Sequence, residues 1–240
     1  MKKLVLMLAL FATGVCELSA QVKFGLKIAP QITWSSTDSK SITTPNSNVN
    51  LGYGLMIDYY FNENYALASE ISISNYSGSI HVADVDVVRS NNPPPQQNIT
   101  IKYDYNLRYV NVPLILRMRT KEIGYFRYFA DFGLDNSFLV KGLANVSTPG
   151  FDLKDVTINN PDKVDEFKVI TKSSPSVTYT DDVSFYRAGY VIGIGTQYNV
   201  FGNTLIVGSL RYNNAMTNYT KEDSWKAKMH AVSLNIGVLF

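Results

Sequence analysis

The last ten residues of the chain alternate between apolar side chains and small or polar ones. One set of alternate positions holds Val232, Leu234, Ile236, Val238 and Phe240, and the other holds Ala231, Ser233, Asn235 and Gly237. Because successive side chains of a β-strand point to opposite faces, this segment predicts a strand with one apolar and one small, polar face. Such a strand suits a sheet whose two faces meet different surroundings, as in a barrel.

The beginning of the chain has the pattern of a secretory leader. Lys2 and Lys3 precede an apolar stretch at 4–12, and Ala20 provides a small residue for cleavage before Gln21. The apolar stretch is too short to cross a bilayer as a helix, and no later stretch approaches the roughly 20 apolar residues required. We therefore expect a signal peptide at 1–20, cleaved on export, and one domain at 21–240 without helical anchors.

Cysteine content and charge narrow the chemistry of the exported domain. The single cysteine, Cys16, lies in the leader. A lipoprotein attachment cysteine usually follows a small residue, whereas Cys16 follows Val15, so we interpret it as an incidental cysteine and not as an attachment site. The exported domain should then use neither disulfides nor thiol chemistry. Removal of the leader leaves a net charge of about +1, which gives no reason to propose nucleic acid as a partner.

Segments with alternating character recur along the whole exported domain. Eight strands are predicted, at 22–35, 50–61, 65–77, 104–119, 125–139, 183–200, 204–217 and 226–240. Pro113 cannot donate a ladder hydrogen bond, so we expect a bulge or a break in the fourth strand. The links after the second, fourth and sixth strands are short, whereas the others are long: 36–49, 78–103, 140–182 and 218–225.

Short turns at one end and long loops at the other are typical of outer-membrane barrels. The pattern therefore predicts an all-β fold, an eight-stranded antiparallel up-and-down transmembrane β-barrel with four long extracellular loops. An even number of strands places both termini at the short-turn end, which would be periplasmic.

The polar face distinguishes a membrane barrel from a soluble one. Soluble barrels also alternate, but their apolar face points inward. Here the apolar face is rich in Tyr, Phe, Leu and Ile, which are too bulky to fill eight strands, whereas the other face carries glycines, serines and charges. We therefore expect the apolar face to contact lipid and the small and charged residues to fill a lumen without an open pore.

Charges in such a lumen should pair, because an isolated buried charge is very costly. The predicted luminal charge network consists of Lys27, Asp58, Glu70, Arg117, Arg127, Asp131, Arg187 and Arg211. Glu70 with Arg117 and Arg127 with Asp131 are plausible pairs, although the sequence alone does not assign them.

Four segments match strand motifs of one known family. Residues 109–117 (YVNVPLILR) resemble Y-x-x-[IV]-P-L-L-[LF]-[KR], residues 193–198 (GIGTQY) resemble G-x-G-x-[EQ]-Y, and 128–133 and 210–218 resemble two further strands. The chain in this respect is similar to the PorT-like outer-membrane β-barrel family of a Gram-negative lineage. The resemblance implies the fold and an outer-membrane location. The namesake of that family assists type IX protein secretion, and the family supplies no catalytic residues.

Few residues suit catalysis or metal binding. The two histidines are His81, at the start of a predicted loop, and His230, on the apolar face, whereas small outer-membrane enzymes generally need a histidine or paired carboxylates in mutual reach. Loop carboxylates that could bind calcium are Asp84, Asp86, Asp152, Asp155, Asp181 and Asp182. Their spacing matches no calcium-binding loop, so solvated charge is favoured and no cofactor or metal is expected.

The sequence thus favours a non-enzymatic outer-membrane barrel that displays loops, either as a surface interaction module or as an accessory to a secretion or assembly machine. The alternative is a small outer-membrane enzyme or a small-molecule transporter. The segment 140–182 is the best candidate for recognition, because connections of that length are uncommon unless functional or disordered. Expected partners are outer-membrane lipid, lipopolysaccharide and an envelope or secretion-machine protein.

Overall fold

The computed structural model describes residues 22–38, 42–89, 97–147, 156–158, 183–221 and 226–240. The predicted leader, with Cys16, lies outside the described residues. The elements are β1 (Val22–Thr37), β2 (Ile42–Thr43), β3 (Ser47–Tyr60), β4 (Tyr65–Arg89), β5 (Gln97–Asn111), β6 (Leu114–Arg119), β7 (Phe126–Ser147), β8 (Val156–Ile158), β9 (Tyr186–Phe201), β10 (Thr204–Ala215) and β11 (Ala227–Leu239). Within these ranges, no helix is long and apolar enough to cross a membrane.

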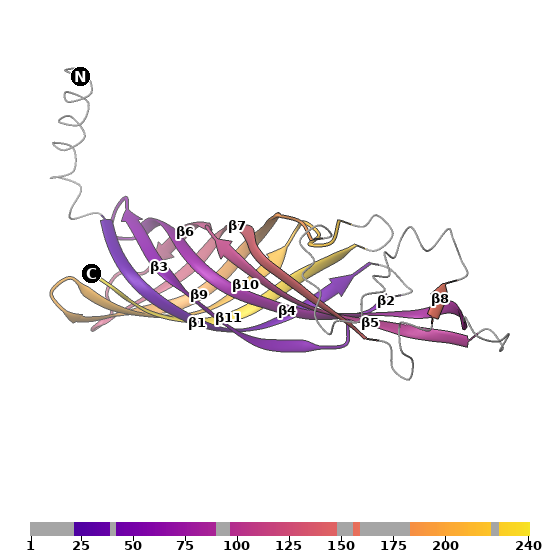
Figure 1. The fold of residues 1–240 in the computed structure, drawn as a ribbon. Coiled ribbons are helices and arrows are strands. Elements are labelled where there is room, and N and C mark those ends of the chain that lie inside the picture. Colours follow the sequence, from indigo (N-terminus) through magenta and orange to yellow (C-terminus); the bar gives the residue numbers. More distant parts are fainter. Residues whose placement is uncertain (1–21, 39–41, 90–96, 148–155, 159–182, 222–225) are drawn as a thin grey trace, which may run out of the picture.

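The strands form one antiparallel sheet that closes on itself as a barrel (Figure 1). Around the ring the order is β4, β3, β1, β11, β10, β9, β7 and then β5 with β6, which share one position and pair back onto β4. The first and last strands pair directly, with Gly25 opposite Leu239. This ring of eight positions confirms the predicted eight-stranded antiparallel barrel.

Pro113 interrupts the strand that was expected at 104–119. β5 ends at Asn111 and β6 begins at Leu114. The Val112 N–H still donates to the Asn136 carbonyl at 2.7 Å, and the Pro113 carbonyl accepts from Ser69 Oγ at 2.9 Å. The predicted break is confirmed, and its cause is the missing N–H of proline.

Several strands run much further than the sequence pattern predicted. β4 has 25 residues and β7 has 22, so the loops expected to begin at 78 and 140 were wrong in their boundaries. Ile80, Val82 and Leu107 continue the inward-facing positions there and are buried, which sustains the strands. β4 and β5 form a long hairpin that projects away from the barrel, and β8 pairs with β4 near the hairpin tip (Figure 1). Residues 148–155 and 159–182 of the segment favoured for recognition lie outside the described residues.

The two faces of the barrel differ sharply in chemistry. On the outer face Leu26 is 61% exposed and Ile194 is 65% exposed, whereas Lys27 on the inner face is only 8% exposed. We call the exposed apolar side chains of the outer face the apolar belt; it includes Phe24, Leu26, Ile28, Leu55, Ile71, Leu114, Leu116, Phe132, Leu134, Ile192, Ile194, Leu210, Leu234 and Ile236. Exposure of such a large apolar surface to water would be strongly unfavourable, so the belt is suited to contact with the acyl chains of a bilayer.

Candidate functional site

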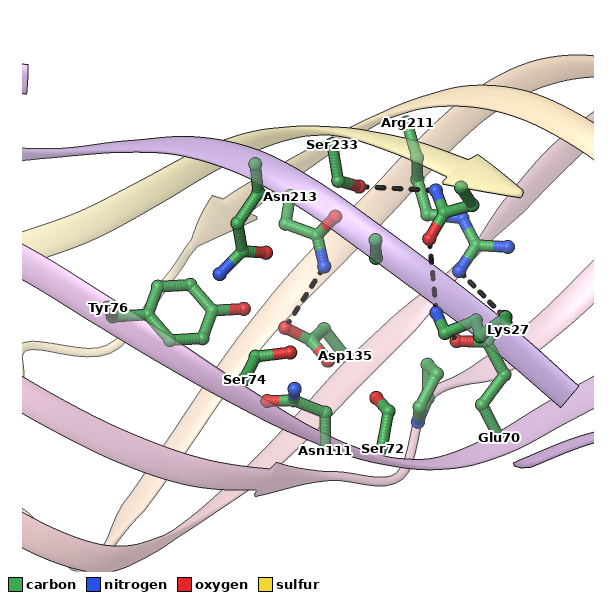
Figure 2. Close-up of a pocket in the computed structure, with 14 residues that line it drawn as sticks. Lys27, Glu70, Ser72, Ser74, Tyr76, Asn111, Asp135, Arg211, Asn213 and Ser233 are labelled. Carbon is green, nitrogen blue, oxygen red and sulfur yellow. Dashed lines mark hydrogen bonds and ion pairs between the residues drawn. The ribbon is translucent and has the colours of Figure 1, made fainter. Parts of the chain in front are cut away.

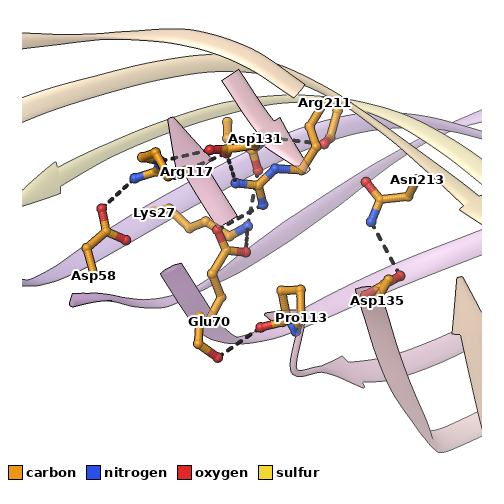
Figure 3. A network of polar contacts seen from close by, with 12 residues as sticks. Lys27, Asp58, Glu70, Pro113, Arg117, Asp131, Asp135, Arg211 and Asn213 are labelled. Atoms are coloured by element: carbon orange, nitrogen blue, oxygen red, sulfur yellow. Dashed lines mark hydrogen bonds and ion pairs between the residues drawn. The ribbon is translucent and has the colours of Figure 1, made fainter. Parts of the chain in front are cut away.

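Buried charges from seven strands converge inside the barrel (Figure 3). Their placement follows from alternation, because each occupies an inward position between two belt residues or small residues. The cations are Lys27, Arg117, Arg187 and Arg211, and the carboxylates are Asp58, Glu70, Asp131 and Asp135. Four positive and four negative groups therefore balance within the network.

Arg117 on β6 holds the end of the network nearer the short turns. Its Nε and Nη2 donate to the two carboxylate oxygens of Asp131 at 2.8 and 3.1 Å, and its Nη1 donates to Asp58 Oδ2 at 2.5 Å. The guanidinium also lies over the Phe129 ring, 4.3 Å from the centroid. A two-pronged arginine–carboxylate pair of this kind fixes geometry as well as charge.

Glu70 on β4 forms the middle of the network (Figures 2 and 3). One of its oxygens accepts from the Lys27 ammonium, and the other accepts from Arg211 Nη1 at 2.8 Å. Arg211 Nη2 donates onward to Asp131 Oδ2 at 3.0 Å. Asp131 therefore joins the two parts into one connected network that spans the lumen.

Arg187 on β9 anchors a second group nearer the long hairpin. It donates to Asp135 Oδ2 at 2.9 Å, to the Tyr76 hydroxyl at 3.0 Å and to the Met229 carbonyl at 3.0 Å. Its guanidinium lies 4.2 Å from the Tyr76 ring centroid and 5.3 Å from that of Tyr109. Hydrogen bonds and ring contacts together satisfy a cation that is 2% exposed.

Above Arg187 the lumen is closed by an apolar cap. The cap consists of Ile42, Tyr76, Ile80, Val82, Tyr105, Leu107, Tyr109, Ala144, Val183, Tyr219, Ala227, Met229 and Ala231. Tyr76 and Tyr109 meet edge to face with centroids 5.7 Å apart, and Tyr105 and Tyr219 do so at 5.3 Å. Burial raises the pKa of the Tyr219 phenol, which hydrogen-bonds with Ser35 Oγ at 3.2 Å and stays neutral at physiological pH.

Little free space remains between these groups. A cavity of about 20 Å³ lies among Lys27, Glu70, Asn111, Asp135 and Arg211, as Figure 2 shows in close-up. That volume is enough for about one water molecule. The lumen is thus packed with side chains at this level, and the apolar cap covers it on the hairpin side.

Most of the residues predicted for the network lie together, and one does not. Seven of the eight predicted residues form buried ion pairs in the lumen. Arg187 belongs to the group that it forms with Asp135, and the others belong to the network around Asp131 and Glu70: Lys27, Asp58, Glu70, Arg117, Asp131 and Arg211. Arg127 instead pairs with Glu122 at 2.7 Å, and both side chains are about one third exposed. Arg127 lies at the start of β7, where the strand emerges beside the short 120–125 turn, so its long side chain reaches the barrel rim.

The two pairings suggested from sequence also differ from the observed ones. Glu70 pairs with Lys27 and Arg211 rather than with Arg117, and Asp131 pairs with Arg117 and Arg211 rather than with Arg127. The register explains both differences, because Arg117 and Asp131 are directly opposed on β6 and β7. A sequence pattern gives the face of each residue but not this register.

Asp135 was not among the residues predicted for the network, and neither the buried Arg119 nor the cap was predicted. Arg119 donates to Gln197 Oε1 at 3.1 Å and to the Glu63 carbonyl at 2.9 Å, and it lies 3.9 Å from the Tyr60 ring centroid. The sequence did contain a signal for the cap, because Tyr105, Leu107 and Tyr109 fall on the same alternate positions as the inward residues that follow them. The polar residues between these three made this end of the strand resemble a loop.

The residues considered for catalysis or metal binding lie apart from the network. The His230 ring is tilted by 33° relative to the Trp34 ring, with centroids 5.9 Å apart. Its Nδ1 accepts from the Ala215 N–H, and its Nε2 hydrogen-bonds with Ser36 Oγ at 2.7 Å. His81 lies in β4 opposite Lys102. In the part of the chain that the structure describes, no group of three or more potential ligands could hold a metal ion. Asp152, Asp155, Asp181 and Asp182 fall outside the described residues, and only the backbone of Asp84 and Asp86 is described.

Comparison with solved structures gives distant likenesses. Neisserial surface protein A is 12% identical with a TM-score of 0.44, over 91% of this chain and 95% of that one. OprG from Pseudomonas aeruginosa is 10% identical with a TM-score of 0.44, over 92% and 97%. The protease OmpT from Escherichia coli is 8% identical with a TM-score of 0.38, over 92% and 96%. No curated protein matches the sequence.

A family model provides the stronger finding. The model described as "Outer membrane protein beta-barrel domain" matches residues 17–221, which is most of the chain. That match agrees with the closed eight-position ring, the apolar belt and the charged lumen. The chain therefore belongs to the outer membrane protein beta-barrel domain family.

Proposed function

We propose that this protein is a non-enzymatic scaffold of the outer membrane whose extended strands present a recognition surface outside the cell. In this proposal the leader is removed before Gln21, both termini are periplasmic, and the β4–β5 hairpin is extracellular. The described end of β11 lies at the end of the barrel opposite the hairpin, as expected for that orientation (Figure 1).

The length of the strands is the observation that carries the proposal. A tilted strand crosses a bilayer in about 9–11 residues. β4 has 25 residues and β7 has 22, so about half of each is not needed for crossing. Paired strands are rigid, and rigid elements position recognition residues better than loops do.

The lumen supports a structural role rather than transport or catalysis. The luminal carboxylates Asp58, Glu70, Asp131 and Asp135 all accept from a buried cation, which leaves them poorly suited to act as a free base. The cavity beside Glu70 and Asp135 has a volume of only about 20 Å³. Both features favour a plugged scaffold over a channel or a luminal active site.

The PorT-like motif at 109–117 supports a narrower form of the proposal. Tyr109, Asn111, Pro113 and Arg117 of that motif are buried at inward positions around the β5–β6 break. The motif thus coincides with a structural feature of the lumen, and we propose on this basis that the chain is PorT-like. The recognised partner would then be an envelope or secretion-machine protein.

The proposal is tested by shortening the hairpin without touching the barrel. Val82 pairs with Ile101, so an Asn-Gly turn in place of 83–100 would close β4 onto β5 at that level. A photo-cross-linking residue at exposed Asn106 should trap a protein partner in whole cells, and the shortened variant should lose that product. A cross-linker at Leu26 in the apolar belt is the matched control and should trap no protein. Identical products from the full and shortened chains would contradict the proposal.

A further inference from the structure

The apolar belt has a definite upper edge on three neighbouring strands. Ile73 pairs with Val110, and Val110 pairs with Phe138, which forms the last apolar row of the outer face on the hairpin side. Beyond that row, Asn75 and Arg108 are the next outward positions on β4 and β5, and on β7 the exposed Val140 lies between Phe138 and Lys141, which is the partner of Arg108. The pairing therefore continues from an apolar row into a row that holds Asn75, Arg108 and Lys141.

The row lies at the depth of lipid headgroups. Two residues along a strand advance about 7 Å, which corresponds to roughly 5 Å of height in a tilted strand. The headgroup layer on each side of the hydrocarbon core is about 5–7 Å thick. Arg108 and Lys141 are both exposed on the outer wall and thus face that layer.

Arg108 and Lys141 are directly opposed like charges. They are Cα partners across β5 and β7, and a register shift between Arg108 and Tyr109 adjoins the pair. Like charges in opposed positions destabilise a sheet unless an anion lies between them. Among the described residues, no carboxylate forms an ion pair with either side chain.

Asn75 orients the arginine of this pair. Its Oδ1 accepts from Arg108 Nε at 2.9 Å, so this hydrogen bond engages one of the three guanidinium nitrogens. A fixed guanidinium fork beside a flexible ammonium is an arrangement suited to phosphate oxygens. The pair is therefore built to accept an anion at headgroup depth.

We infer that Arg108 and Lys141, with Asn75 as a positioning residue, bind a phosphate group of the lipid A portion of lipopolysaccharide. The inference rests on the proposed orientation, in which the hairpin side faces the lipopolysaccharide leaflet. A lone phosphate ion shares the chemistry but lacks the acyl chains that would lie against Val110 and Phe138.

The test compares binding of bis-phosphorylated and dephosphorylated lipid A by the purified protein in detergent, measured by native mass spectrometry. The intact protein should prefer the phosphorylated form. Each of Arg108→Gln and Lys141→Gln should weaken binding of the phosphorylated form about fivefold, and the double variant should weaken it about 25-fold. The reason is that each surface cation contributes roughly a factor of five to attraction toward an anionic headgroup. Lys121→Gln, in the short turn at the other end, is the matched control and should leave the preference unchanged.

Three results would overturn the inference. They are equal binding of the two lipid forms, an unchanged preference in the two single variants, and full displacement of lipid A by inorganic phosphate, which would indicate a free-anion site. A heat-dependent gel shift checks that each variant is folded, and the single variants carry the test if the double variant is not. Labelling of Asn106→Cys in intact cells reports the orientation separately, so a failure of the proposed function is distinguishable from a failure of this site.

Discussion

Arg117 and Asp131 are opposed in register on β6 and β7, and their side chains form a two-pronged ion pair with N–O distances of 2.8 and 3.1 Å. The pair is almost completely buried, and Asp131 also accepts from Arg211 at 3.0 Å. The backbone register thus places Asp131 between two arginines.

Removal of Asp131 should destabilise the barrel strongly. Asp131→Ala leaves two buried guanidiniums short of a partner, so the free energy of unfolding should fall by about 3–5 kcal/mol. Urea titration in lipid vesicles, followed by tryptophan fluorescence, measures the change. Glu122→Ala removes a carboxylate from the exposed pair with Arg127 and should cost less than about 1 kcal/mol. Equal effects of the two substitutions would contradict the network's role.

Arg187 should tolerate neither lysine nor methionine, and methionine should be worse. Lysine keeps the charge but cannot reproduce the contacts to Asp135, the Tyr76 hydroxyl and the Met229 carbonyl, so we expect a loss of about 1–3 kcal/mol. Methionine also leaves Asp135 without its cation, at a cost of about 3–5 kcal/mol. The same urea titration ranks the unsubstituted protein and the two variants by their free energy of unfolding. A methionine variant as stable as the lysine variant would show that charge pairing at Asp135 is unimportant.

Substitution by alanine should destabilise the barrel at one of two glycines on neighbouring strands and have little effect at the other. A Cβ on Gly195 would lie 2.4 Å from Phe129 Cζ and 2.5 Å from the Gly208 carbonyl oxygen, whereas a Cβ on Gly208 meets nothing within 4 Å. Phe129 cannot move freely, because Arg117 lies over its ring. Gly195→Ala should therefore cost about 1–3 kcal/mol, and Gly208→Ala should change stability by less than about 0.5 kcal/mol. Thermal gel-shift midpoints of both variants are the measurement, and a reversed order would refute the inward placement of Gly195.

The purified protein should form no steady channels in planar bilayers. Arg117, Glu70 and Arg211 cross the lumen, and the cap that contains Tyr76 and Tyr109 covers it. Single-channel recording tests this, with an open porin in the same apparatus as a control for detection. Long-lived unitary currents from the intact protein would contradict a plugged lumen.

Alternation in the sequence was sufficient to predict the ring of strands and the side of each residue. Val232 to Val238 illustrates why, since a period of two assigns every side chain to one face without knowledge of its neighbours. Pro113 could be interpreted as a break for a similarly local reason, its missing N–H. Such properties reside in single residues or short windows.

Properties that depend on neighbouring strands could not be predicted in this way. The partners of Glu70 depend on the register of β1, β4 and β10, and the rim position of Arg127 depends on where β7 emerges from the barrel. The continuation of β4 past Ser77 depends on burial of Ile80 and Val82 under residues distant in sequence. A local pattern contains no information about that burial.

The central claim is that the apolar face of each strand contacts lipid and the charged face fills the lumen. The only cysteine, Cys16, lies in the predicted leader, so single cysteines at 232–238 of β11 can carry spin labels one at a time. Collision with lipid-soluble oxygen, compared with a water-soluble nickel complex, reports the surroundings of each label. We predict high oxygen contact at Val232, Leu234, Ile236 and Val238 and low contact at Ser233, Asn235 and Gly237. The opposite phase, or no period of two, would contradict this orientation of the barrel wall.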